Sequence, residues 1–120
     1  MIRDFKDLKV WQKSMDLTEE VYRLVKFLPK EETYSLSDQM RRAAVSIPSN
    51  IAEGCHRDTD RDFKHFLHIA RGSTAELETQ VQLCLRLKYF SKEEANCVIM
   101  LIEEVSKMLN AFIRKLTAND

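Results

Sequence analysis

The sequence predicts an all-α protein, an up-down antiparallel four-helix bundle formed by a single domain over residues 1–120. Apolar residues recur at steps of three and four through four long segments, which is the spacing of one face of an α-helix. Two glycines and two prolines in 120 residues are too few for the turns of a sheet protein. The connections between the segments are short, so neighbouring helices are expected to run in opposite directions.

The first helix is predicted from about Leu8 to Phe27, with Asp7 as its N-cap and Pro29 as its stop. Two apolar rows follow the helical period. The first row, which we expect to face the core, is Leu8, Trp11, Met15, Thr18, Tyr22 and Val25. The second row, which widens the buried face, is Val10, Leu17, Val21, Leu24 and Leu28.

The second helix is predicted from about Leu36 to Gly54. Ser35 or Ser37 can cap its first turn through the side-chain oxygen. Gly54 provides a natural end, because glycine is favoured just past the last helical turn.

Pro48 lies inside this second helix, where it removes one backbone donor and clashes with the carbonyl of Ala44, at a cost of about 3 kcal/mol. The apolar spacing stays in phase across the proline, which favours one kinked helix over two short ones. Ser46, Ser49 and Asn50 flank the kink and can satisfy the backbone groups that the proline leaves unpaired.

The third helix is predicted from about Asp60 to Lys88, with Asp58 or Thr59 as its cap.

The fourth helix opens with a capping box, in which Ser91 and Glu94 satisfy each other's backbone amides. It continues to Leu116, and residues 117–120 are expected to fray.

Residues 97–102 are six consecutive apolar residues within the fourth helix. Six steps of about 100° cover the whole circumference, so one orientation cannot hide them all. The end of the third helix is nearly as apolar, and the two segments together predict a subunit interface. An overpacked core with a few exposed leucines is the alternative. The predicted oligomer interface is Leu83, Leu85, Phe90, Ile99, Met100 and Leu101.

The charges balance, with 19 basic and 19 acidic residues, which argues against simple polyanion binding by a single copy. Three cysteines lie in helical sequence, and we find neither a signal peptide nor a membrane segment. The expected compartment is therefore the cytoplasm, with reduced thiols.

Six basic residues are the candidates for nucleic-acid contact, and several of them share one face of the third helix. A solvated face of mixed charge is the alternative, because acidic residues dilute the same region. A small patch repeated around a symmetric assembly would nevertheless create a substantial positive field. The candidates are Arg41, Arg42, Arg57, Arg61, Lys64 and Arg71.

No catalytic residue, cofactor or metal site is predicted. Glu53 and His56 match the Glu-x-x-His spacing of di-iron bundles, but Gly54 is expected to end the helix between them.

Three stretches, residues 8–11, 39–54 and 70–80, resemble the family of four-helix bundle proteins named after intervening sequences in bacterial 23S rRNA genes. The resemblance covers nearly the whole chain, in order. It implies a homopentameric ring and kinship with the accessory variability protein of diversity-generating retroelements, a barrel thought to contact nucleic acid and a reverse transcriptase. It implies no catalytic activity.

Physically, these stretches indicate a kinked and tightly crossed pair formed by the second and third helices. Residues whose numbers sum to roughly 114–118 are expected at one level of this pair. Gly72 and Ser73 are small, as a close approach requires, and an Arg42–Glu76 ion pair is expected across it. The structural signature is Pro48, Asn50, Glu53, Gly54, Gly72, Ser73, Glu76 and Glu78.

The function that we expect is that of a non-enzymatic, homo-oligomeric helical scaffold that binds RNA or DNA. The alternative is a protein-binding adaptor that uses the apolar rim of the last two helices and has no nucleic-acid contact.

Overall fold

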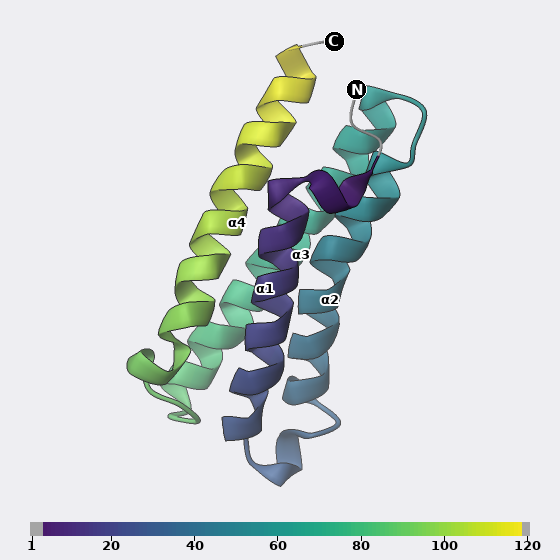
Figure 1. The fold of residues 1–120 in the computed structure, drawn as a ribbon. Helices are drawn as coiled ribbons and strands as arrows, with labels where there is room; N and C mark the ends of the chain where they lie inside the picture. Colours follow the sequence, from purple (N-terminus) through teal and green to yellow (C-terminus); the bar gives the residue numbers. More distant parts are fainter. Residues whose placement is uncertain (1–3, 119–120) are drawn as a thin grey trace.

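The computed structural model describes residues 4–118, which form an antiparallel four-helix bundle about 45 Å long (Figure 1). Successive helices run in opposite directions, which confirms the predicted fold class. The helices are α1 (Lys9–Leu24), α2 (Leu36–Cys55), α3 (Asp60–Arg86) and α4 (Lys92–Ala118). Short 3-10 turns are formed by Phe5–Asp7, Val25–Phe27 and Lys30–Glu32.

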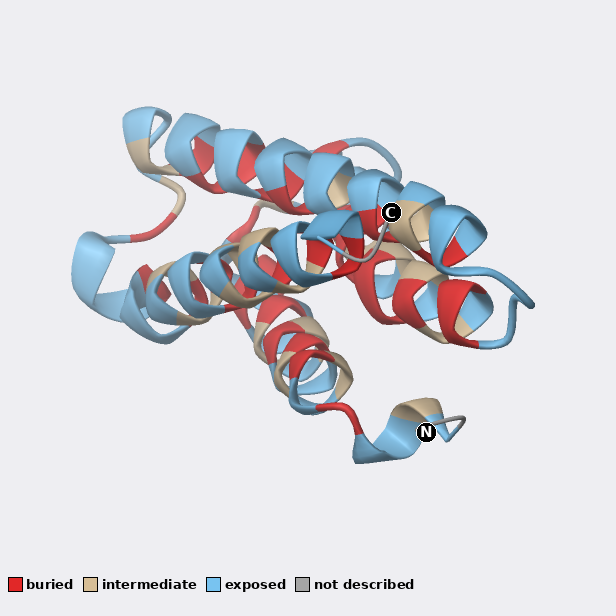
Figure 2. Ribbon diagram, turned by 90° about the horizontal axis from the view of Figure 1, so that it is seen from above, coloured by how far each residue is buried: buried red, intermediate tan, exposed pale blue. Residues whose placement is uncertain are grey.

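Each helix packs against its two neighbours around one hydrophobic core. The buried residues line the inner faces of the helices, and the outer faces are exposed (Figure 2). Fully buried side chains from all four helices meet there, among them Leu17, Ile47, Leu77 and Leu109. Their removal from water is the main favourable term in the stability of the bundle.

Of the two apolar rows of α1, the second is buried as expected, whereas the first is buried only at its ends, at Leu8 and Val25. Leu17 and Val21, from the second row, are completely buried. Met15 and Tyr22, from the first row, remain 38% and 46% exposed. Both rows have the helical period, and Ser14 is also fully buried, so spacing alone could not tell which row faces the core.

The predicted caps are partly confirmed. Thr59 accepts a hydrogen bond from the amide of Asp62, and Ser91 and Glu94 form the predicted capping box. Asp7 was the wrong N-cap for α1, because it lies in the preceding 3-10 turn and Leu8 occupies the cap position without a side-chain bond.

Ser35 occupies the N-cap position of α2, but its hydroxyl donates to the Glu32 carboxylate instead of capping the helix.

Pro48 lies inside a single uninterrupted α2, which excludes the alternative of two short helices. The Ala44 carbonyl, which the proline cannot bond, accepts a hydrogen bond from the hydroxyl of Thr18 on α1 (3.1 Å). Asn50 donates to the Ser46 carbonyl (2.8 Å), as expected of a residue that flanks the proline. The kink itself stays a prediction.

The ends of the last two helices differ slightly from the prediction. The α-helix of α3 ends at Arg86, and Lys88 takes a left-handed conformation with φ of 62°. This position usually belongs to glycine in a helix C-cap. Thr117 was expected to fray, but it is helical and donates to the carbonyl of Ile113. The end of that prediction, residues 119–120, lies outside the described residues.

Candidate interaction surfaces

Gly54 lies at a close contact between α2 and α3. It is buried within the last turn of α2, so it does not end the helix as predicted. A Cβ atom built on Gly54 would lie 2.8 Å from the Cβ of Phe66 and 3.1 Å from the carbonyl oxygen of Phe63. The glycine is therefore required for the approach of the two helices.

Gly72 was predicted to lie at a close approach of α2 and α3 near Arg41 and Arg42, and that prediction was wrong. A Cβ atom at Gly72 would meet nothing within 4 Å. Its neighbour Ser73 does lie at the contact, where its hydroxyl and that of Ser46 are 2.8 Å apart. The residues of α2 and α3 that lie opposite one another are thus close to the expected ones, but Gly72 faces outward.

Arg42 was expected to pair with Glu76, and the structure contradicts this. Arg42 pairs instead with Asp38, one turn earlier on α2, with 3.4 Å between Nη2 and Oδ2. Glu76 and Glu78 are exposed on α3. Such surface pairs contribute little to stability. The close packing at Gly54 therefore stabilises the contact between α2 and α3 more than these charges do.

The six candidate nucleic-acid residues fall into two groups. Arg41 and Arg42 lie near the start of α2, and the other four lie after its end or on α3. Arg42 and Arg57 are separated by fifteen residues, which corresponds to about 22 Å along a helix axis. Arg42 and Arg57 therefore lie far apart along the length of the bundle.

Arg57 and Arg41 each contact a neighbouring side chain or backbone carbonyl. The Arg57 guanidinium lies 4.7 Å from the ring centroid of Phe66 and pairs with Glu53 at 3.7 Å. Arg41 donates to the carbonyl of Thr33 at 3.3 Å. These contacts orient the guanidinium groups without removing their positive charge.

Arg61, Lys64, His68 and Arg71 follow one another at steps of three, four and three, so they share an outer face of α3. Arg71 donates from Nη1 to Asn110 Oδ1 on α4 (3.1 Å) and from Nη2 to His68 Nδ1 (2.9 Å). A guanidinium is only a donor, so His68 Nδ1 accepts and its Nε2 carries the proton.

Partial burial, followed by the charges of Arg71, Lys64 and His65, lowers the pKa of His68. His68 was not among the basic candidates predicted from the sequence. The spacing of His68 from Lys64 and Arg71 could have indicated that it shares their face of α3.

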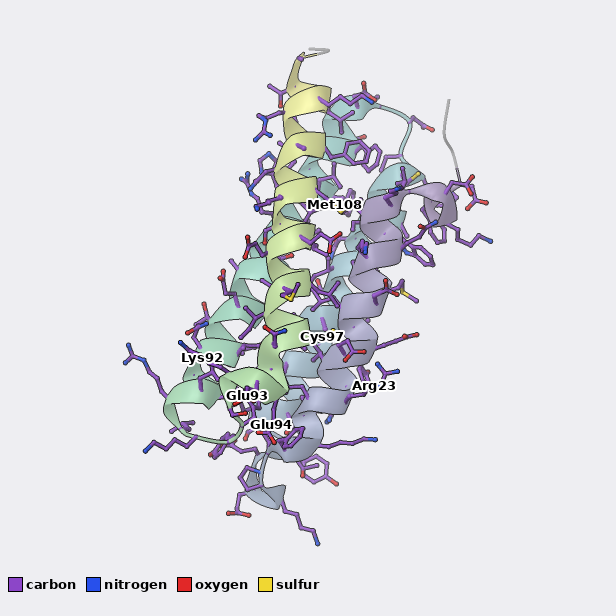
Figure 3. The ribbon with its side chains drawn as sticks, turned by 60° about the vertical axis from the view of Figure 1, so that its left-hand side comes forward. Arg23, Lys92, Glu93, Glu94, Cys97 and Met108 are labelled. Carbon is purple, nitrogen blue, oxygen red and sulfur yellow. The ribbon has the colours of Figure 1, made fainter. Side chains whose placement is uncertain are left out.

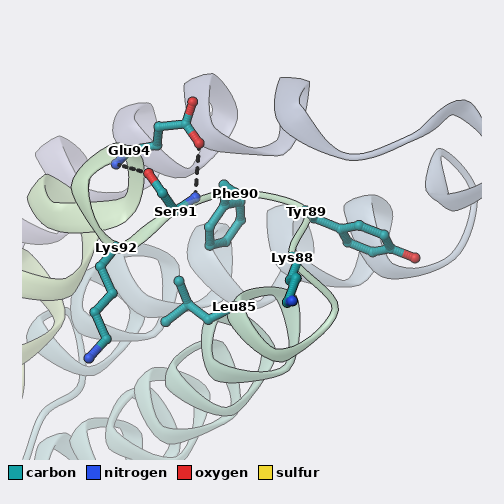
Figure 4. A pocket seen from close by; sticks show the side chains of 7 residues that line it. All are labelled: Leu85, Lys88, Tyr89, Phe90, Ser91, Lys92 and Glu94. Atoms are coloured by element: carbon teal, nitrogen blue, oxygen red, sulfur yellow. Dashed lines mark hydrogen bonds between the residues drawn. The ribbon is translucent and has the colours of Figure 1, made fainter.

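The six predicted interface residues do not form one exposed surface. Phe90 is only 5% exposed and closes the end of the core beside the loop between α3 and α4 (Figure 4), so it is a core residue of the single copy. Leu85, Ile99 and Leu101 pack partly against the core. Leu83 and Met100 are exposed by 44% and 61%.

Leu83 and Met100 lie on different sides of the bundle. Met100 faces α1, where it lines a hollow with Cys97 and Leu101. On α3, Leu83 lies ten residues after Ser73, whose hydroxyl contacts α2, and three residues after Gln80. Helical spacing therefore places Leu83 toward the α2 side.

A half-exposed apolar groove runs between α1 and α2, which the sequence argument missed as a surface. Three adjoining hollows form it, and all three are lined by Val45. We call it the α1–α2 groove. Its apolar members come from the misassigned row of α1 and from α2: Trp11, Met15, Tyr22, Val45, Pro48 and Ala52.

A second groove lies on the other side of α1, against α4, and we call it the α1–α4 groove. Cys97, Met100 and Leu101 contribute its apolar members. Figure 3 shows Arg23 on α1 and Cys97 on α4 in this region. Burial, with a smaller contribution from Glu20, raises the pKa of the Cys97 thiol, which makes it a poor nucleophile.

A polar contact ties the loop between α3 and α4 to the turn before α2. The Tyr89 hydroxyl donates to the Glu32 carboxylate at 2.8 Å. Hydrogen bonds from Ser35 and then Tyr89 lower the pKa of Glu32, and the same bond to Glu32 raises the pKa of Tyr89. Burial raises the pKa of the nearby Cys84 thiol to about 11, so it behaves as a small apolar side chain.

Within residues 4–118, no three or more His, Cys, Asp or Glu side chains gather as a metal site would require. None of the helices in that range is apolar over a sufficient length to cross a membrane.

Together, these features describe a four-helix bundle with two apolar grooves beside α1 and a row of basic side chains on α3. The family model of the 23S rRNA-intervening sequence protein matches residues 6–111. This chain therefore belongs to that family, as the resemblance predicted.

One similar solved structure is a crystal structure of a protein with unknown function from the S23 ribosomal protein family of Bacteroides thetaiotaomicron. It is 30% identical to this chain, with a TM-score of 0.80, and the alignment covers 87% of this chain and 97% of that one. No curated protein matches the sequence.

Proposed function

We propose that this protein is a non-enzymatic, cytoplasmic scaffold that works as a homo-oligomer. The observation that carries the proposal is the α1–α2 groove, where Met15, Tyr22 and Val45 are each about 40% exposed along one continuous surface. A contiguous apolar surface of this kind is typical of an interaction site. Five copies is the number that the family resemblance implies.

Light scattering of the purified protein over a wide concentration range tests this proposal. We expect a mass that is a multiple of the 14.1 kDa chain. A mass of 14.1 kDa at every concentration would contradict self-association.

A second part of the proposal is that the assembly binds RNA or DNA through the outer face of α3. Arg61, Lys64, His68 and Arg71 share this face, which places three permanently charged basic side chains and one imidazole side by side. Repetition of this face in an assembly would concentrate the positive field, although one copy has no net charge.

Binding to a labelled RNA at several salt concentrations tests this second part. We expect affinity to fall steeply as salt rises, because bound phosphates release counterions. Arg71→Gln should weaken binding and reduce the salt slope, whereas Lys9→Gln, at an exposed position of α1 outside both grooves, serves as the matched control. The absence of RNA and DNA binding by the assembled protein at low salt would leave the protein-binding adaptor, for which exposed Leu83 and Leu87 are the supporting observation.

A further inference from the structure

We propose that the copies associate head to tail, with the α1–α2 groove of one copy docked against the α1–α4 groove of the next. This inference rests on the self-association proposed above and names the two faces that meet. It also moves most of the contact away from the predicted interface, from which only Met100 and Leu101 are retained.

Both grooves offer apolar surface that the single copy leaves in contact with water. In the α1–α2 groove, Tyr22 is 46% exposed and Val45 is 41% exposed. In the α1–α4 groove, Met100 is 61% exposed, and Cys97 beside it is also exposed. Burial of these side chains on association supplies a favourable free energy in proportion to the apolar area removed from water.

The borders of the two grooves carry opposite charge. Lys26, Arg41, Arg42 and Asp38 border the α1–α2 groove, which gives a net charge of +2. Glu19 and Arg23 lie on the ridge of α1 between the grooves and line both of them, so their formal charges add nothing to the net charge of either border. Arg23 itself pairs with Glu20.

Asp16, Glu20 and Glu104 border the α1–α4 groove, and Lys13 pairs with Glu104 at 3.3 Å. The net charge of this border is therefore −2. The two grooves are complementary in sign as well as in apolar character, and such complementarity favours their association over like-charged pairings.

The same charges disfavour pairing of either groove with its own copy. Two α1–α2 grooves would bring Arg41 and Arg42 of one chain toward those of another, and two α1–α4 grooves would bring carboxylates together. An interface between two different faces is heterologous, and it generates a ring where the rotation closes. A second copy is the natural occupant because each chain carries both halves of the contact on the two sides of one helix.

Two charge-introducing variants test this arrangement. Val45→Glu places a negative charge where an acidic groove should dock, and Met100→Lys places a positive charge where a basic groove should dock. Both positions are exposed in the single copy, so both variants should fold, which circular dichroism and thermal unfolding will verify. Light scattering should give 14.1 kDa for each variant alone.

A mixture of the two variants should regain an assembly of at least about 28 kDa, twice the 14.1 kDa chain. The reason is that Val45→Glu chains keep an intact α1–α4 groove and Met100→Lys chains keep an intact α1–α2 groove. Leu83→Glu is the matched control for Val45→Glu, because Leu83 is 44% exposed and Val45 is 41% exposed, but Leu83 lies outside both grooves. This variant should keep the wild-type mass.

The outcomes separate the two proposals. A wild-type protein that is always monomeric overturns self-association and this inference together. An assembled wild type whose mass is unchanged by Val45→Glu or Met100→Lys, or is broken by Leu83→Glu, overturns this inference alone. Loss of assembly in both variants without recovery on mixing also overturns it, because head-to-tail docking requires complementation.

Discussion

Two regions of the molecule differ in how they use small and apolar residues. One is the contact between α2 and α3, and the other is formed by the two flanks of α1. At the α2–α3 contact, Gly54 lets the helices approach until the backbone meets the Phe66 side chain, and the Ser46 and Ser73 hydroxyls pair. Along α1, Met15 and Tyr22 are left half-exposed in an open groove. The first region is packed within one chain, whereas the second leaves apolar side chains in contact with water, and we propose that a second copy covers them.

The largest difference is expected between the two rows of α1. Leu17→Ala should lower the free energy of unfolding by about 2–5 kcal/mol, because it leaves a cavity in a fully buried site. Met15→Ala should change it by less than about 1 kcal/mol in the single copy. Urea unfolding at low protein concentration measures both, and equal losses would show that the two rows are not distinct.

The two glycines give the next largest contrast. Gly54→Ala should destabilise the bundle by about 1–3 kcal/mol, because the new Cβ overlaps Phe66 Cβ and the Phe63 carbonyl. Gly72→Ala meets no atom and should stabilise the protein by up to about 1 kcal/mol through helix propensity. Thermal unfolding of the pair should therefore show shifts of opposite sign, and shifts of the same sign would refute the assignment.

Thr18 connects the two regions, because its hydroxyl satisfies the Ala44 carbonyl that Pro48 leaves without a donor. Thr18→Val should cost about 1–2 kcal/mol. The loss should be smaller in a Pro48→Ala background, where the backbone amide returns to the helix. A double-mutant cycle measures this coupling, and additive losses would mean that the hydroxyl has no such role.

The smallest effect concerns the partly buried hydrogen bond between Tyr89 and Glu32, which belongs to neither region. Folding lowers the pKa of Glu32, so its contribution to stability is present above the ordinary glutamate pKa and is lost as the pH falls through the lowered value. Tyr89→Phe should raise the pKa of Glu32 toward its ordinary value and weaken this dependence. NMR titration of the Glu32 carboxyl would detect the change, and an unchanged pKa would contradict it.

Helix positions and two caps could be predicted because they depend on local spacing and local hydrogen bonds. The Ser91–Glu94 capping box and the Thr59 cap each join residues only three positions apart, within a single helical turn. The orientation of α1 could not be predicted in this way. Both of its rows are apolar, and only the packed partners decide which row is buried.

The same limit applies to the candidate surfaces. Gly54 and Gly72 are both glycines within helical sequence, and their different surroundings come from the rotation of α2 and α3 about their axes. The apolar run of residues 97–102 correctly indicated exposed side chains, since Cys97 and Met100 face solvent. It could not show that Met100 lies beside α1 while Leu83 lies on the α2 side.

The most direct test of the central claim uses Trp11, the single tryptophan of the chain, which lies in the α1–α2 groove. Its emission and the light-scattering mass are followed together in one dilution series. The docked groove predicts that Trp11 emission shifts to longer wavelength at the same concentrations at which the mass falls to 14.1 kDa. A fall in mass with unchanged Trp11 emission would contradict docking at this groove.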